Sequence, residues 1–174
     1  MTTASPQLCE PIEMSSPPAP AGFAGLYERH CEAVFRSALR VTGNPADAED
    51  VLQTVFLRVF SGGEADEAAR RPAAYFRRAA VNAAVDLLRR RAVRPETVYD
   101  DGAPHAAVQT PLLLKERLRR AVATLERDDA TLFLLRHVEG LSIEELAGVF
   151  GLEKNNVAVR LHRIRLRLQT EMER

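Results

Sequence analysis

Residues 141–168 read LSIEELAGVFGLEKNNVAVRLHRIRLRL, a stretch with the layout of two helices joined by a tight turn. Ser142 and Glu145 are spaced as a capping box, in which each side chain bonds the amide of the other residue at a helix start. Apolar residues then recur at helical spacing as far as Phe150, and Gly151 stands where a left-handed residue ends a helix. The apolar stripe of the second helix is Val157, Leu161, Ile164 and Leu168. The stretch therefore predicts a helix-turn-helix.

The second of these helices is basic, which favours DNA as its partner. In a helix-turn-helix this helix lies in the major groove of DNA. An amphipathic helix with a solvated basic face is the alternative, but the capping box, the turn glycine and the one-sided charge together favour DNA contact. The basic residues, mostly off the apolar stripe, are Lys154, Arg160, Arg163, Arg165 and Arg167.

The chain of 174 residues has a formal net charge of zero, yet its charges are sorted into blocks. Residues 70–94 contain eight arginines and a single acid, Asp86, whereas residues 46–67 contain six acids and a single base, Arg58. Such blocks indicate that different surfaces of the protein meet different partners.

The sequence contains no recognisable catalytic or metal-binding constellation. Cys9 and Cys31 are too few for a disulfide framework or a structural zinc site, and on a helix His30 points away from its neighbour Cys31. We find no Gly-rich phosphate loop, no signal peptide and no run of about 18 apolar residues. We therefore expect a cytoplasmic protein that is not an enzyme, needs no cofactor or metal and does not insert into membranes.

Composition divides the chain into two helical domains. Five of the ten prolines lie in residues 1–22, which have the composition of a disordered leader. Residues 23–94 and 112–174 show helical periodicity, and residues 95–111 have the composition of an acidic, flexible linker. The predicted fold class is all-α, with two small helical domains joined by this linker. The helices expected before the helix-turn-helix are 23–41, 45–60, 72–91, 112–125 and 130–139.

Three blocks, in this order, resemble the bacterial sigma factors of the extracytoplasmic-function group, which belong to the sigma-70 family. Residues 44–60, NPADAEDVLQTVFLRVF, resemble the family segment D-A-E-D-hydrophobic-hydrophobic-Q-E-x-F. Residues 75–91, YFRRAAVNAAVDLLRRR, resemble the family stretch W/Y-hydrophobic-x-x-I/A-A-x-N-x-x-x-D-x-x-R-R. The third block is the helix-turn-helix, which ends with residues 157–163, and the resemblance covers residues 23 to 170.

The resemblance implies a partner for each domain. The first domain would resemble sigma region 2, which binds core RNA polymerase, including the clamp helices of its β′ subunit, and melts the −10 promoter element. The second would resemble sigma region 4, which reads the −35 element, and the β subunit is a further expected contact. By the family pattern Asp50 and Gln53 meet polymerase, and Phe56 follows three residues later as an apolar anchor. The family has Glu after this glutamine, where the chain has Thr54.

In the family, the arginine-rich stretch 75–91 engages the non-template strand of the −10 element. Asn82 and Asp86 lie four residues apart on one helix face and would hold a flipped base. The alternative is that Asp86 pairs locally with Arg89 or Arg90. We expect Phe76 to lie in the core rather than to stack on bases. The arginines expected to neutralise phosphates are Arg77, Arg78, Arg89, Arg90 and Arg91.

The start of the basic helix departs from the common family pattern Gly-Thr-Val-Lys/Arg-Ser-Arg-Leu. By family analogy Ala158 and Val159 face the bases, where they can contact thymine methyl groups but cannot donate hydrogen bonds. His162 and Arg163 would make polar contacts with bases or phosphates. The remaining residues expected at the −35 element are Lys154, Asn155, Asn156 and Arg160.

These observations predict a sigma factor, and two other functions remain as alternatives. A free-standing helix-turn-helix regulator would explain the C-terminal domain but not the block around Asp50 and Gln53. An RNA-binding antiterminator would explain the arginines but not the two domains. The resemblance also implies an anti-sigma partner, and it implies that the linker threads near the active-site channel of polymerase. A long linker would let the two domains close on each other.

Overall fold

The computed structural model describes residues 23–61, 65–93 and 111–173, and every regular element in these ranges is an α-helix. This confirms the predicted all-α fold class. The predicted leader 1–22 and residues 95–110 of the predicted linker lie outside the described residues. The helices are α1 (Phe23–Thr42), α2 (Pro45–Phe60), α3 (Ala65–Arg70), α4 (Pro72–Val93), α5 (Pro111–Thr124), α6 (Arg127–His137), α7 (Ile143–Phe150) and α8 (Lys154–Glu173).

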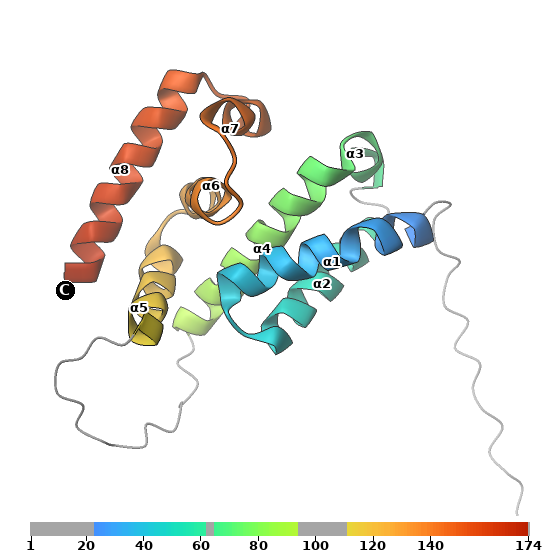
Figure 1. Ribbon diagram of the computed structural model, residues 1–174, viewed down its shortest axis with the longest axis horizontal. Coiled ribbons are helices and arrows are strands. Elements are labelled where there is room, and N and C mark those ends of the chain that lie inside the picture. Colours follow the sequence, from blue (N-terminus) through green and yellow to red (C-terminus); the bar gives the residue numbers. More distant parts are fainter. Residues whose placement is uncertain (1–22, 62–64, 94–110, 174) are drawn as a thin grey trace, which may run out of the picture.

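The helices α1, α2 and α4 form the first bundle (Figure 1). Gly43 reverses the chain after α1 with a φ of 72°, a conformation that suits glycine. The side chain of Asn44 then caps α2 by accepting a hydrogen bond from the Ala46 amide at 2.9 Å, and Pro45 occupies the first turn. The largest fully buried side chains of this bundle are Phe76, Val34, Val51, Val55, Val59, Val81 and Val85.

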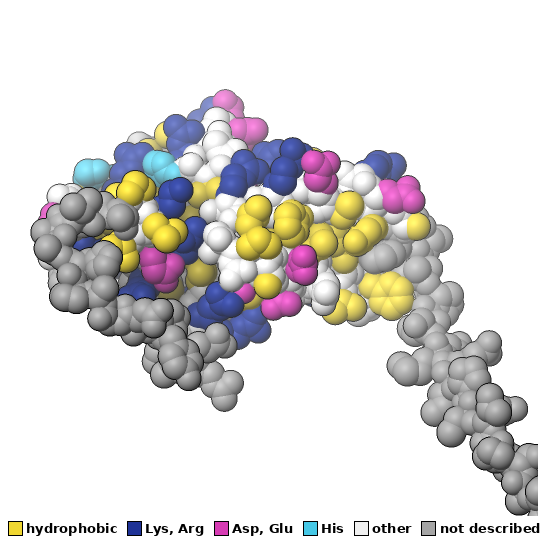
Figure 2. All heavy atoms as spheres, turned by 60° about the horizontal axis from the view of Figure 1, so that its bottom comes forward, with side chains coloured by type: hydrophobic (Ala, Val, Ile, Leu, Met, Phe, Trp, Pro, Cys, Tyr) yellow, Lys and Arg dark blue, Asp and Glu magenta, His cyan; other side chains and the backbone are white. Residues whose placement is uncertain are grey.

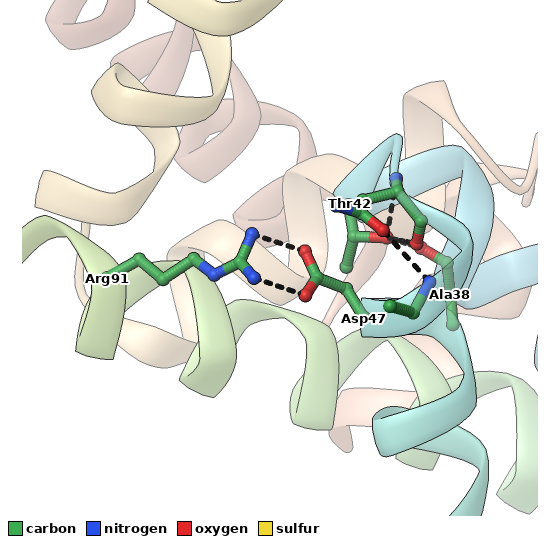
Figure 3. A network of polar contacts seen from close by, with 6 residues as sticks. Ala38, Thr42, Asp47 and Arg91 are labelled. Carbon is green, nitrogen blue, oxygen red and sulfur yellow. Dashed lines mark hydrogen bonds and ion pairs between the residues drawn. The ribbon is translucent and has the colours of Figure 1, made fainter. Parts of the chain in front are cut away.

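An ion pair between a buried carboxylate and a half-exposed arginine joins the start of α2 to the end of α4. Asp47 is 2% exposed, and both of its carboxylate oxygens accept hydrogen bonds from the Arg91 guanidinium at 2.5 Å (Figure 3). Beside this pair, the hydroxyl of Thr42 donates to the Ala38 carbonyl at 3.0 Å. Asp47 is in the first turn of α2, where the helix dipole favours an anion, but its partner is a specific arginine of another helix.

The helices α5 to α8 form the second bundle, which contains the predicted helix-turn-helix. The capping box is confirmed: the Ser142 amide donates to Glu145 Oε2 at 2.8 Å, and the Glu145 amide donates to Ser142 Oγ at 3.1 Å. These bonds hold the pKa of the Glu145 carboxyl below its usual value. Gly151 ends α7 in the left-handed conformation with a φ of 63°, as predicted.

The two bundles pack against each other through α4, which lies between α1 and α2 on one side and α5 and α6 on the other (Figure 1). The buried residues of both bundles belong to one continuous apolar cluster. Several helix boundaries differ from the prediction by one to three residues. Pro111, expected to end the linker, opens α5, and α6 begins at Arg127 because Asp128 and Asp129 suit the first turn of a helix. The short helix α3 was not predicted.

Candidate promoter and polymerase interfaces

The helix α8 turns its apolar stripe inward and keeps its polar face at the surface. Val157, Leu161, Ile164 and Leu168 are at most 4% exposed, which confirms the predicted stripe. Ala147 of α7 packs nearby, and its small side chain allows the two helices to approach closely. The residues of the predicted −35 site that are exposed on α8 are Lys154, Asn155, Asn156, Val159, His162 and Arg163, with Ala158 half-buried between them.

Two residues of the predicted −35 site are paired with acids of the second bundle: Lys154, whose Nζ lies 2.7 Å from Glu144 Oε1 and which stays exposed, and Arg160, which is half-buried. The Nε of Arg160 lies 2.5 Å from Asp129 Oδ1, and its side chain is 35% exposed. Arg167 lies 3.7 Å from the other oxygen of the same carboxylate. In this conformation Asp129 therefore ties α8 to α6 through Arg160, a structural contact that helix periodicity alone does not predict.

Two of the predicted −10 residues of α4, Asn82 and Asp86, contact the second bundle. Asn82 Oδ1 accepts a hydrogen bond from the Thr131 hydroxyl at 2.7 Å. Asp86 pairs with Arg127 at 2.8 Å, so its partner here is neither a base nor the neighbouring Arg89 or Arg90. Sequence periodicity could not have found these partners, because they lie more than 40 residues away along the chain.

The arginines of α4 fall into two groups. Arg77 lies 3.9 Å from Glu139, and Arg78 donates to the Val149 carbonyl at 3.3 Å, so the first group also meets the second bundle. At the other end of the helix Arg90 is exposed and Arg89 is half-buried, while Arg91 pairs with Asp47. The predicted −10 site is therefore partly covered at its centre and open at the C-terminal end of α4.

The predicted polymerase-binding face of α2 is exposed, with one exception. Asp50 and Gln53 are at the surface, whereas Phe56 is 4% exposed, and its ring lies 5.0 Å from that of Phe76. The prediction that Phe56 anchors a partner is therefore wrong for this structure, because the side chain belongs to the core, as Phe76 does. Leu57, seven residues after Asp50 on the same helix face, is a 63% exposed apolar side chain that sequence reasoning missed.

Figure 2 shows apolar side chains at the surface of the half of the molecule that contains the first bundle, with acidic side chains among them. The described residues contain no group of three or more His, Cys, Asp or Glu side chains placed to hold a metal ion. None of the helices described is both long enough and apolar enough to cross a membrane. The apolar side chains at the surface of the first bundle suit contact with a partner macromolecule.

Family comparisons agree with the division into two bundles. The family models Sigma-70 region 2 and Sigma-70, region 4 match residues 26–94 and 115–168. The RNA polymerase sigma-E factor of Streptomyces coelicolor is 32% identical over 148 residues, which cover 81% of this chain and 80% of that protein. The ECF RNA polymerase sigma factor SigL of Mycobacterium tuberculosis is 30% identical over 143 residues, which cover 79% of this chain and 81% of that protein.

Among solved structures, CnrH in complex with the cytosolic domain of CnrY is similar to this chain. The two share a TM-score of 0.53 and 25% sequence identity, and the similarity covers 88% of each chain. The similarity therefore spans both bundles.

Proposed function

The chain belongs to the extracytoplasmic-function group of the sigma-70 family of RNA polymerase sigma factors, and from this membership we propose which of its surfaces meet polymerase and promoter DNA. It is a sigma factor, which binds core RNA polymerase, directs transcription initiation and binds DNA through its helix-turn-helix. The observation that carries this conclusion is the match of both sigma regions in order, the second with a complete capping box and turn glycine. Sigma factors are not enzymes, and polymerase supplies the catalysis.

Residues 23–94 form the domain that we assign to polymerase binding, through the exposed face of α2. Asp50 and Gln53 offer a carboxylate and an amide on one helix face, and Leu57 adds an exposed apolar side chain beside them. Such a face suits a partner helix that has both polar and apolar groups. The expected partners are the clamp helices of the β′ subunit, with further contacts to the β subunit.

Residues 112–174 form the domain that we assign to the −35 element. The exposed side chains at the start of α8 suit phosphate contacts, because the helix N-terminus and Lys154 both attract anions. Val159 is 45% exposed and can contact a thymine methyl group, while Arg163 can donate to a base or a phosphate. Ala158 and His162 complete the face toward the bases.

The −10 strand is assigned to α4. Its arginines can neutralise phosphates, and the pair Asn82 and Asp86 presents hydrogen-bonding groups on one helix face. We also propose a cytoplasmic location, where polymerase acts, and an inhibitory partner protein of the anti-sigma type. The second proposal is supported by the similarity to CnrH, which was solved with another protein bound.

Run-off transcription tests the function directly. Purified core polymerase is supplied with a pool of genomic fragments, with and without the protein, and new transcript starts are mapped. We expect discrete new starts that are lost with Asp50→Ala plus Gln53→Ala. The matched control is Glu32→Ala plus Gln169→Ala, which removes one exposed carboxylate and one exposed amide elsewhere and should leave the starts intact. DNA binding without any new start would instead identify a free-standing regulator.

A further inference from the structure

A groove of about 520 Å³ lies beside α8, on the face that we assign to the −35 element. Three residues expected at that element, Asn156, Val159 and Arg163, are exposed and line the groove. Two acids from the start of α6, Glu126 and Asp129, line it as well. A carboxylate beside a DNA-binding face repels phosphates, so the position of these acids affects how α8 can bind DNA.

Asp129 is the centre of a charge cluster in this groove. The Nε of Arg160 donates to Asp129 Oδ1 at 2.5 Å, and Nη1 of Arg167 lies 3.7 Å from Asp129 Oδ2. Arg160, Arg163 and Arg167 are spaced three and four residues apart, so they share one face of α8. A single carboxylate therefore pairs with two of the three arginines on this face.

The exposed fractions distinguish this cluster from the ion pair at the start of α8. The side chains of Lys154 and Glu144 are 63% and 75% exposed, so solvent screens their attraction, and a phosphate can readily replace the carboxylate. The side chains of Arg160 and Asp129 are only 35% and 13% exposed. Because a partly buried pair is screened less, Asp129 holds Arg160 more firmly than Glu144 holds Lys154.

Arg167 is restrained by charge rather than by burial. Its side chain is 64% exposed, and its distance of 3.7 Å from the carboxylate is longer than a hydrogen bond. A phosphate that binds this guanidinium also approaches Asp129, and the two anions repel each other. The same carboxylate therefore opposes phosphate contacts by both arginines.

We propose that Asp129 is a positioning residue of the −35 interface, which withholds Arg160 and Arg167 from DNA phosphates and leaves Arg163 as the DNA-contacting arginine of this face. The inference rests on the assignment of α8 to the −35 element. Phosphate contacts add affinity regardless of sequence, so Asp129 lowers the sequence-independent affinity of α8. The contacts of Val159 and Arg163 with bases then make up a larger share of the binding.

The test is the salt dependence of DNA binding by the full chain, measured by fluorescence anisotropy with a labelled random-sequence duplex of about 25 base pairs. The slope of log Kd against log salt concentration counts neutralised phosphates, at about 0.9 per contact. Asp129→Asn removes the charge but keeps an oxygen that can accept a hydrogen bond from Arg160. We expect the slope to steepen by about 1 to 2, and the affinity at about 0.1 M salt to rise about tenfold for each added contact.

The matched control is Asp128→Asn, which removes the same charge from the neighbouring, exposed position of α6. It measures the effect of net charge alone and should leave the slope unchanged. A further variant adds Arg160→Gln and Arg167→Gln to Asp129→Asn. It should cancel the gain, because the new phosphate contacts come from these two arginines.

Circular dichroism shows whether each variant is folded, and Asp129→Ser replaces Asp129→Asn if the amide lowers the helical signal. A purely structural role of Asp129 predicts weaker binding with no steeper slope, and this result would overturn the inference. An equal rise in slope for Asp128→Asn, or a gain that survives the loss of both arginines, would overturn it as well. Run-off transcription is measured in parallel. If the wild-type chain produces no new start, the proposed function fails, while the salt slopes still decide the role of Asp129.

Discussion

The helices α8 and α4 both carry arginines assigned to DNA, but α8 packs on one side and α4 packs on two. The buried residues of α8 form one stripe of four side chains, which leaves most of its circumference at the surface. The buried residues of α4 surround most of the helix and include Ala79, Ala80, Ala83 and Ala84. These small side chains allow neighbouring helices to approach closely on both sides.

This difference in packing determines how much of the polar face of each helix is exposed to solvent. A helix that buries a single apolar stripe in its own bundle leaves its polar face at the surface, as α8 does. A helix between two bundles exposes the polar groups along its centre only when the bundles separate, while its end can remain open, as at Arg90. The −35 face of α8 is therefore built into the second bundle, whereas the −10 face of α4 depends on how the two bundles are arranged.

The largest expected loss of stability comes from shortening a side chain in the buried apolar stripe of α8. Ile164 is 1% exposed, and Ile164→Ala leaves a cavity that should cost about 2–5 kcal/mol of unfolding free energy. Urea denaturation followed by circular dichroism measures this loss. Leu166→Ala is the control, because Leu166 of the same helix is 52% exposed. Its expected effect on the unfolding free energy is within about 0.5 kcal/mol. Equal losses for the two variants would mean that α8 is not packed on one side only.

Loss of the ion pair between Asp47 of α2 and Arg91 of α4 should cause the next largest loss of stability. Asp47→Ala leaves Arg91 without its partner and should destabilise the first bundle by about 2–3 kcal/mol, because Asp47 is buried while Arg91 is half-exposed. Thermal unfolding measures the change, and Glu49→Ala, at an exposed position two residues later, is the control. A change as small as that of the control would show that Asp47 acts only on the helix dipole.

Binding of duplex DNA by the free protein should depend on the exposed residues of α8 and not on those of α4. Arg163→Ala removes an exposed contact and should weaken binding to a promoter duplex by about tenfold, a loss of roughly 1.4 kcal/mol. Arg77→Ala should leave this binding almost unchanged, because Arg77 faces Glu139 in the closed arrangement. Gel-shift titrations with each variant give the two affinities. A large effect of Arg77→Ala on the free protein would mean that α4 is already accessible.

The smallest expected effect concerns His137 at the end of α6. Burial first, and the charges of Arg165 and Arg136 second, lower the pKa of His137 in the folded protein. The unfolded state therefore binds a proton more readily, so stability should fall as the pH drops through the ordinary histidine pKa of about 6.5. Denaturation at pH 7.5 and pH 5.5 should show a smaller difference for His137→Gln than for the wild-type chain. An identical difference would rule out this histidine as a source of the pH dependence.

Local chemistry in the sequence was enough to predict the helix-turn-helix and the all-α fold. The capping box at Ser142 and Glu145, the cap at Asn44 and the left-handed Gly151 each act within a few residues. The stripe of α8 follows from the period of 3.6 residues per turn. Such signals depend on neighbours along the chain, so they were readable before any tertiary contact was known.

Only the tertiary structure decided what surrounds α2 and α4. The period of α2 places both Phe56 and Leu57 near Asp50 and Gln53, and only packing shows that Phe56 enters the core while Leu57 stays exposed. Likewise, Asp86 could pair along its own helix, but it meets Arg127, which lies 41 residues away in the sequence. The choice among charged partners is set by which helices lie side by side, because an ion pair needs close approach and the sequence alone does not determine that distance.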